Sequence, residues 1–282
     1  MIYHYTDKDC LIKILGLHNS QDENINEKNI TFHAFSVKSY IGQEELAFNF
    51  EDILPYLKEV ESEMEIENLF QLSRIKSQCL LTQMNAEPFI DFKHYGHHDP
   101  YAISFSANEN CDCLWLKHNY CLCLDEQYMY MPSDKFLLFY DKVSYGIEKE
   151  KIKSIIRRWY NTYLFGGVFQ HNNIYNDIVQ NNLEILNSIR FDLFSIIKTP
   201  PFQKEEEYRA VCVVGKNEDI VQTNEDGRKY VDIQYSRSVL CKIIYRAETP
   251  LTEIKEILCL LNQSGYSAKE QGCEIIVEFP IM

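Results

Sequence analysis

Glycine is scarce in this chain, and long apolar runs are absent from it. Only 10 of the 282 residues are glycine, which argues against folds that hold a nucleotide on a glycine-rich loop. No run of about 18 or more apolar residues occurs, so the sequence predicts no membrane-spanning helix. The first residues, MIYHYTDKDC, lack the basic and then apolar pattern of a secretory signal. These absences predict a cytoplasmic protein with no membrane partner.

Basic residues are outnumbered by acidic ones. Lysine and arginine total 28, aspartate and glutamate total 42, and the formal net charge is −14. A chain this acidic gains nothing from long-range attraction to phosphate backbones or anionic lipid. A nucleic acid would need a local basic groove, for which Arg157 and Arg158 beside Trp159 are the best candidate. Such a pair on a helix is more often a solvated face.

Several familiar enzyme signatures are also missing. The sequence contains no G-x-S-x-G elbow, no G-x-x-x-x-G-K-[ST] loop and no H-E-x-x-H helix. Serine hydrolases of the elbow type, P-loop nucleotide hydrolases and zincin proteases therefore lose support. The hydrophobic fraction of 45% and charged fraction of 25% are ordinary for a globular protein and exclude a wholly disordered chain.

Ten cysteines are present, and without an export signal we expect them to be thiols. Six stand among apolar neighbours and are predicted to be small core residues: Cys10, Cys79, Cys212, Cys241, Cys259 and Cys273. The other four form two Cys-x-Cys pairs, Cys111 with Cys113 and Cys121 with Cys123. Four thiols can bind zinc, but the usual spacing of roughly two to four residues within a pair is missing. We interpret them as packed thiols, with structural zinc and a redox role as alternatives.

Apolar periodicity predicts strands and helices that do not alternate as regular βαβ units. Strand patterns occupy 2–6, 30–36, 101–106, 111–116, 121–124, 135–146, 207–215, 229–235, 239–246 and 273–280. Helical patterns occupy 7–16, about 43–83, 148–165, 172–198 and 251–265. The order predicts one α+β domain over 1–282, with a mixed or antiparallel split sheet and flanking helices. We expect a helical insertion at about 43–83 and a helical segment at about 148–198.

The first pattern that suggests chemistry is Tyr3-His4-Tyr5-Thr6. In a strand, His4 and Thr6 point to one face, and Tyr3 and Tyr5 point to the other. An imidazole and a hydroxyl on one face can hydrogen-bond a sugar diol, while aromatic rings can sandwich a planar heterocycle. The plainer alternative is a core strand whose histidine pairs with a backbone carbonyl.

The second pattern is an acidic run, KEEEYR at 204–209, that leads into the apolar sequence AVCVVG. Strand alternation places Glu205, Glu207 and Arg209 on one side. Two carboxylates one pleat apart repel each other, which tends to raise one pKa, while Arg209 opposes that shift. The group could stabilise a cationic transition state. The alternative is a solvated acidic turn, although the apolar sequence predicts that the strand is buried.

A weaker third pattern is Ser104-Phe105-Ser106, followed by Trp115 as a stacking surface. Taken in order, these patterns resemble a broad bacterial family of domains of unknown function. The resemblance rests on the YHYT strand, an apolar-Phe-Ser motif at 103–106, a Leu-Trp stretch at 114–120 and a C-terminal E-x-E-aromatic-Arg pattern. That last pattern corresponds to Lys198, Phe202, Glu205, Glu207, Tyr208 and Arg209. The family is similar to the ADP-ribosyltransferase-like fold.

The resemblance implies an enzyme that cleaves the nicotinamide–ribose bond of NAD. It implies catalytic roles for Glu207 and His4, with Glu205 as the less favoured match for the glutamate. It implies contacts to NAD from Tyr3, Tyr5, Thr6, Ser36, Tyr40, Ser106, Trp115 and Arg209. The acceptor would be an unknown protein or nucleic acid, or water, no metal would be needed, and the setting would be a bacterial toxin or phage-defence effector. The alternative is a non-catalytic module that senses a nucleotide or nucleic acid.

Overall fold

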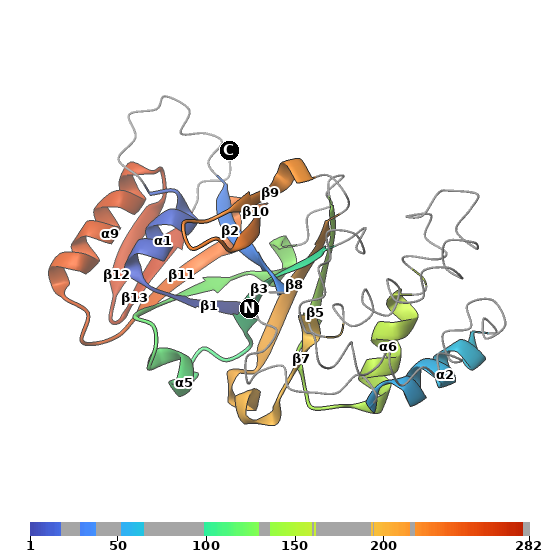
Figure 1. Cartoon of the computed structure of the whole chain (residues 1–282). Helices are drawn as coiled ribbons and strands as arrows, with labels where there is room; N and C mark the ends of the chain where they lie inside the picture. Colours follow the sequence, from blue (N-terminus) through green and yellow to red (C-terminus); the bar gives the residue numbers. More distant parts are fainter. Residues whose placement is uncertain are drawn as a thin grey trace.

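A large antiparallel sheet organises this chain in the computed structural model (Figure 1). The structure describes residues 1–17, 29–37, 52–64, 99–129, 136–159, 161, 193, 195–214 and 218–278. The strands are β1 (Ile2–Thr6), β2 (Ile30–Ser36), β3 (Asp99–Ser106), β4 (Tyr120–Leu124), β5 (Phe136–Lys142), β6 (Ser144–Tyr145), β7 (Ile197–Lys198), β8 (Glu207–Val214), β9 (Val221–Thr223), β10 (Lys229–Tyr235), β11 (Leu240–Tyr245), β12 (Ser267–Gln271) and β13 (Glu274–Glu278). The α-helices are α1 (Lys8–Leu15), α2 (Leu54–Glu63), α5 (Asp112–Trp115), α6 (Lys149–Trp159) and α9 (Leu251–Gln263), and the 3₁₀ turns include η8 (Pro200–Glu205). The predicted α+β class is confirmed.

The sheet splits along one edge of β3. Its strand order is β12-β13-β11-β4-β1-β3-β2-β10-β9, and β8 lies between β3 and β5. Strand β1 meets β3 only where Tyr3 faces Ser106, whereas β2 meets β3 at its other end, where Phe35 faces Ala102. Between these points, residues 103–105 have no partner among the described strands on this edge. The two parts of the sheet therefore diverge over the middle of β3.

Helices α1 and α9 contribute to the main core. Helix α1 buries Leu11, Ile14 and Leu15, and it ends at Gly16, whose φ of 62° is the left-handed conformation that glycine adopts without strain. Helix α9 buries Ile254, Ile257 and Leu261. All six side chains belong to one cluster with strand residues from both parts of the sheet. Burial of each such side chain contributes about 1.5–3 kcal/mol, so this shared core joins the two parts of the sheet.

Two of the predicted elements are wrong. The segment 111–116 was expected to be a strand, but α5 begins after Cys111, which is its extended N-cap. Strands β3 and β4 pair with opposite edges of β1 and are both antiparallel to it, so their connection has to cross over β1. Helix α5 lies in that crossover. The end of the predicted helix at 172–198 is also wrong, because Ile197–Lys198 forms a parallel pair with β6.

The helical predictions at 43–83 and 148–198 are otherwise met only in part. Helix α2 lies inside the first range and α6 inside the second, while 43–51, 65–83, 160, 162–192 and 194 lie outside the described residues. Within the described helices, none is long and apolar enough to span a bilayer. Both arginines proposed for a basic groove are engaged in ion pairs, Arg157 with Glu63 and Arg158 with Asp141.

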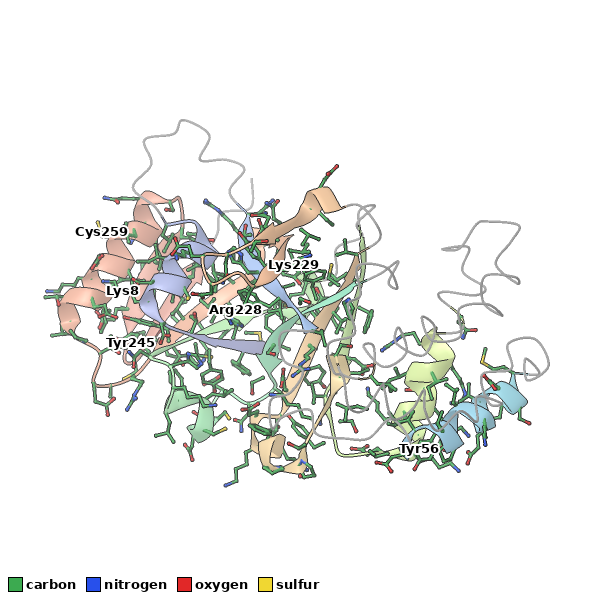
Figure 2. The ribbon with its side chains drawn as sticks, viewed as in Figure 1. Lys8, Tyr56, Arg228, Lys229, Tyr245 and Cys259 are labelled. Atoms are coloured by element: carbon green, nitrogen blue, oxygen red, sulfur yellow. The ribbon has the colours of Figure 1, made fainter. Side chains whose placement is uncertain are left out.

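Three cysteines predicted to be core residues are exposed. Cys259 lies on the side of α9 that faces away from the core (Figure 2). Cys10 lies on a side of α1 that does not pack into the core, and Cys273 lies in the turn between β12 and β13. The apolar neighbours of Cys10 and Cys259 are core-facing residues of the same helices, and those of Cys273 are buried residues of β13, so apolar neighbours in the sequence did not indicate burial of the cysteine itself. Cys212 is buried as expected and Cys241 is half-buried. Cys79 lies outside the described residues.

Candidate functional site

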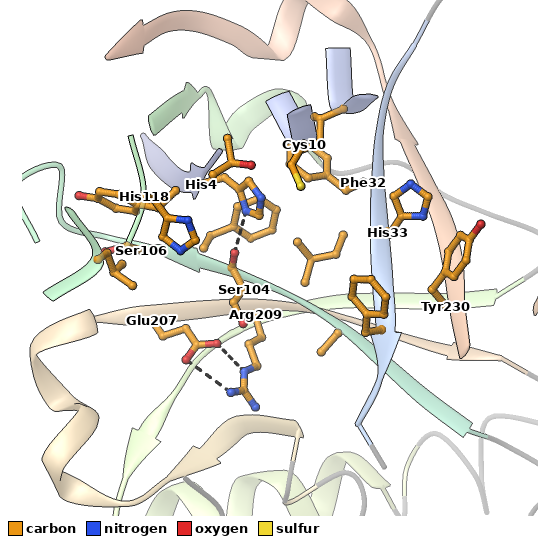
Figure 3. Close-up of a pocket in the computed structure, with 18 of the residues that line it drawn as sticks. His4, Cys10, Phe32, His33, Ser104, Ser106, His118, Glu207, Arg209 and Tyr230 are labelled. Atoms are coloured by element: carbon orange, nitrogen blue, oxygen red, sulfur yellow. Dashed lines mark hydrogen bonds and ion pairs between the residues drawn. The ribbon is translucent and has the colours of Figure 1, made fainter. Parts of the chain in front are cut away.

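A cleft of about 860 Å³ lies where β1 and β2 diverge (Figure 3). Its lining includes residues 3–6 of β1, residues 102–106 of β3, and Glu207 and Arg209 of β8. Figure 3 shows Ser104 between His4 and the Glu207–Arg209 pair. Ligand sites for small molecules commonly have volumes of roughly 300–1,000 Å³. The split sheet thus brings the first and last motifs of the chain to one ligand-sized cleft.

His4 is held in a defined orientation at this cleft. Its Nδ1 lies 3.0 Å from the Ser104 carbonyl oxygen. A carbonyl oxygen only accepts, so Nδ1 carries the proton and donates it, and Nε2 is left as an acceptor. The ring packs edge-on against Phe32 and Phe105, with centroids 5.0 and 5.7 Å away. Burial lowers the pKa of His4 to about 4, so the imidazole is neutral near pH 7.

His4 therefore pairs with a backbone carbonyl through Nδ1, as the alternative interpretation of the strand expected. The carbonyl is that of Ser104 in β3, on the edge where β1 and β2 diverge. His4 also lines the cleft, so its bond to the carbonyl fixes the ring and leaves Nε2 as its remaining polar atom.

The aromatic residues on the other face of β1 are committed to packing. The Tyr5 ring meets Trp115 edge-on at a centroid distance of 5.0 Å. Its hydroxyl donates to Asn108 or Glu109 carbonyl oxygen, each 2.7 Å away, and accepts from the Cys111 N–H at 3.1 Å. Trp115 is not among the residues that line the cleft. Tyr5 and Trp115 thus hold α5 against β1, although Tyr3 and Tyr5 still border the cleft.

Four buried charged side chains form the opposite wall. Lys198 Nζ lies 2.8 Å from Glu205 Oε2 and 2.7 Å from Glu207 Oε2. Arg209 Nε lies 2.6 Å from Glu207 Oε1, and Arg209 Nη1 donates to the Ser195 carbonyl at 3.0 Å. All four residues are less than 10% exposed. Two carboxylates and two cations give this wall, which we call the charged tetrad, a formal charge of zero.

The backbone around the tetrad differs from the predicted strand. Glu205 ends the 3₁₀ turn η8, and the strand begins only at Glu207. Between them Glu206 has φ 44°, a left-handed conformation that few residues other than glycine adopt. Glu205 and Glu207 therefore meet at Lys198 because of this turn and not because of strand alternation. The expectation that Glu205 lies on the strand is corrected accordingly.

The two cations decide the ionisation of Glu207. Burial tends to raise the pKa of its carboxyl group, but the charges of Arg209 and Lys198 and their hydrogen bonds outweigh burial and lower the pKa to about 2. The negative carboxylate in turn raises the pKa of Lys198 despite the burial of that ammonium group. Glu207 is therefore ionised across the physiological range, and the repulsion expected between neighbouring carboxylates does not prevail there.

The remaining predicted site residues have different outcomes. Ser106 borders the cleft and donates from Oγ to the Glu205 carbonyl oxygen at 2.8 Å, which ties β3 to the tetrad. Thr6 also borders the cleft, and its Oγ1 lies 3.5 Å from the Asp7 carbonyl oxygen. Ser36 is buried at the end of β2 and is not among the lining residues. Tyr40 lies outside the described residues.

The cleft also contains residues that the sequence did not point to. Lys13 of α1 and Arg228, which precedes β10, supply cations at its border. The Arg228 guanidinium lies 5.0 Å from the Phe35 ring centroid, and His33 packs on Tyr230 at 4.4 Å. These residues come from elements that meet only in the folded sheet, so no local motif marks them.

His118 is a further lining residue, from the loop before β4. Its Nδ1 is buried without a hydrogen-bond partner within the described residues and lies 3.8 Å from Asp7 Oδ1. Burial lowers the pKa of this imidazole. In the sequence, His118 stands between the two Cys-x-Cys pairs. The structure places it at the cleft instead.

The cysteine pairs lie on the other face of β1. Cys121 and Cys123 of β4 face Tyr5 and Tyr3 across the strand pair and are fully buried. Cys111 packs into the same small cluster as Tyr5 and Cys121. Within the described ranges, no group of three or more His, Cys, Asp or Glu side chains is arranged to hold a metal ion. Cys111, Cys121 and Cys123 are buried as packed thiols would be, whereas Cys113 is half-buried.

Comparisons of the chain with protein-family models, with curated proteins and with solved structures find no match. The residues of the cleft are therefore the basis for a functional proposal.

Proposed function

We propose that the cleft binds NAD or a related nucleotide and that the protein is an ADP-ribosyltransferase-like enzyme. It cleaves the nicotinamide–ribose bond and transfers ADP-ribose to an unknown macromolecule or to water. One observation carries this proposal: His4 and Thr6 line the same cleft as the ionised carboxylate of Glu207. The resemblance of the YHYT and E-x-E-aromatic-Arg patterns to the ADP-ribosyltransferase-like fold supports it, and so does the split in the sheet.

The chemistry follows from the charges at the cleft. When the bond between ribose C1′ and the nicotinamide nitrogen breaks, its electron pair leaves with nicotinamide and C1′ becomes cationic. A fixed carboxylate near C1′ stabilises this cation, and Glu207 is held in the ionised form. The acceptor then forms a bond to C1′ and releases its proton to the solvent. Neutral His4 accepts a hydrogen bond from a ribose hydroxyl at Nε2 and orients the sugar.

A second candidate is a module that binds the nucleotide without turning it over. The observation that favours it is the pairing of Glu207 with two cations at 2.6–2.7 Å. These partners cancel much of the negative potential that would stabilise a cation at C1′. Both candidates predict binding in the cleft, and only the first predicts release of nicotinamide.

Calorimetry and product analysis together test the proposal. The protein is titrated with NAD and with ADP-ribose, and nicotinamide is measured by chromatography after incubation with NAD. We expect binding and release from the wild type, and binding without release from Glu207→Gln. Glu256→Gln is the matched control, because Glu256 is an exposed carboxylate on α9 paired with Lys8. Binding without release by the wild type would favour the second candidate, and no binding of either ligand would contradict both.

A further inference from the structure

The side chains of Cys111 and Cys113 meet although a regular helix would keep them apart. Their Sγ atoms are 3.0 Å from each other. Side chains two positions apart in an α-helix do not face each other. Cys111 is the N-cap of α5, and its extended backbone, with φ −74° and ψ 97°, turns its side chain toward Cys113. The two thiols are thus placed together by the geometry of the helix start.

Solvent reaches one member of this pair and not the other. Cys111 is 2% exposed, whereas Cys113 is half-buried at the surface of α5. Burial and the neighbouring Cys113 thiol raise the pKa of Cys111 to about 11. A small reagent therefore meets Cys113 first, and Cys111 stands beside it as the second thiol. This is the arrangement of an attacking and a resolving cysteine.

Cys111 also connects the two motifs that border the cleft. Its Sγ donates to the Lys204 carbonyl oxygen at 3.3 Å, immediately before Glu205 of the charged tetrad. Its N–H donates to the Tyr5 hydroxyl of β1 at 3.1 Å. A change in the chemical state of this sulfur therefore acts on the segment that carries the tetrad.

The second Cys-x-Cys pair provides a contrast within the same protein. Cys121 and Cys123 have the same spacing but lie on β4, with no solvent exposure. The strand is also paired on both edges, with β1 and with β11. This pair is therefore out of reach of a reagent in solvent, whereas Cys113 is accessible.

We propose that Cys111 and Cys113 form a modification site, a dithiol that small organic disulfides convert reversibly to an intramolecular disulfide. The Cys113 thiolate attacks one sulfur of the small disulfide, forms a mixed disulfide and expels one thiolate. The Cys111 thiolate then attacks the Cys113 sulfur and expels the second thiolate. The two thiolates that leave take up the two cysteine protons. The protein loses two electrons and two protons, and the small disulfide gains them.

Oxidation removes the hydrogen that Cys111 donates to the Lys204 carbonyl, so the segment before Glu205 loses a contact with α5. The disulfide closes a ring of only three residues, and such short loops add little stability. We therefore expect small thiols to reduce it readily. This inference does not depend on the proposed reaction with NAD.

Peptide mapping tests the site directly. The protein is incubated with oxidised glutathione, denatured, treated with iodoacetamide and digested with trypsin. The tryptic peptide 94–117 contains Cys111 and Cys113 as its only cysteines, and the peptide 118–135 contains Cys121 and Cys123. We expect the first peptide to be unalkylated and lighter by two hydrogen atoms, and the second to be doubly alkylated. Dithiothreitol added before denaturation should restore both thiols of the first peptide.

Two variants and one further readout complete the test. Cys111→Ser keeps a donor for the Lys204 carbonyl but has no thiol to attack the mixed disulfide, so its Cys113 should remain a glutathione adduct. Cys113→Ser should form neither the adduct nor the intramolecular disulfide in this peptide. Amide hydrogen exchange at 204–206 should be faster in the oxidised wild type than in the reduced protein. Equal oxidation of both peptides, or a stable glutathione adduct on the wild type, would overturn the modification site. Unchanged exchange in the oxidised protein would overturn its connection to the tetrad.

Discussion

Lys198 is the centre of the charged tetrad, and removing it is expected to destabilise the protein strongly. Its ammonium group lies within 2.8 Å of both Glu205 and Glu207. In Lys198→Met, Glu205 loses its cation and Glu207 keeps only Arg209. Breaking a buried ion pair by removing one partner costs about 3–5 kcal/mol, because the other charge stays buried without compensation. That loss is a large part of the roughly 5–15 kcal/mol that stabilises a typical domain.

Urea unfolding followed by circular dichroism measures this loss. The midpoint for Lys198→Met should fall by roughly 1 M or more relative to wild type, at an unchanged slope. Lys8→Met is the matched control, since Lys8 pairs with Glu256 at the surface and exposed pairs contribute only about 0–1 kcal/mol. Adding Glu205→Gln to Lys198→Met should recover part of the loss, because the carboxylate without a cation is then removed.

A small loss of stability in Lys198→Met would contradict the burial cost assigned to the tetrad. The free energy of unfolding of Lys198→Met could lie within about 1 kcal/mol of the wild-type value, which is the loss expected for an exposed ion pair. In that case the tetrad does not carry the burial cost assigned to it. A Lys198→Met, Glu205→Gln protein that is no more stable than Lys198→Met would also contradict it, since Glu205 has no other ion-pair partner among the described residues.

Three further predictions concern single groups at the cleft. The pKa of Glu207 is about 2 in the folded protein, against an ordinary value of 4.5. The ionised carboxylate therefore adds to the free energy of unfolding above pH 4.5, and this stabilisation is lost as the pH falls toward 2. Between pH 4.5 and pH 2, the free energy of unfolding of the wild type should fall by about 3 kcal/mol more than that of Glu207→Gln. An equal fall in the two proteins would show that Glu207 is not paired. In NMR titration, the His4 ring should change charge near pH 4, and a midpoint near the ordinary value of 6.5 would contradict its burial. Arg228 is expected to contact a phosphate of ADP-ribose, so Arg228→Gln should weaken binding of ADP-ribose by roughly tenfold. Lys229 is the next residue but does not line the cleft, so Lys229→Gln should leave the affinity unchanged.

Strands with a clear alternation were predictable from the sequence. The predicted strands at 30–36 and 229–235 coincide with β2 and β10, whose buried residues alternate with a period of two. The predicted strand at 2–6 coincides with β1, which is rich in aromatic and β-branched residues. Strand β12 was missed because its sequence, SAKEQ, has a single buried side chain. Helix α5 was missed because the apolar residues of 111–116 suit a strand equally well, and only the crossover over β1 selects a helix.

The candidate site was predictable where the sequence places polar groups in apolar strands. His4 and Glu207 are of this kind, and both border the cleft. The role of Lys198 could not be derived from alternation, because it depends on the left-handed turn at Glu206. Lys13 and Arg228 depend on how α1 and the β9–β10 hairpin meet across the split, which is a property of the folded sheet and not of any local pattern.

Release of nicotinamide in a single turnover tests the central claim most directly. The protein, in excess over NAD labelled in the nicotinamide ring, is incubated at pH 7.5, and free label is separated from NAD over time. The proposal predicts time-dependent release by the wild type and none by Glu207→Gln that circular dichroism shows to be folded under the assay conditions. Label that stays in NAD with the wild type, or release that is equally fast in Glu207→Gln, would contradict it.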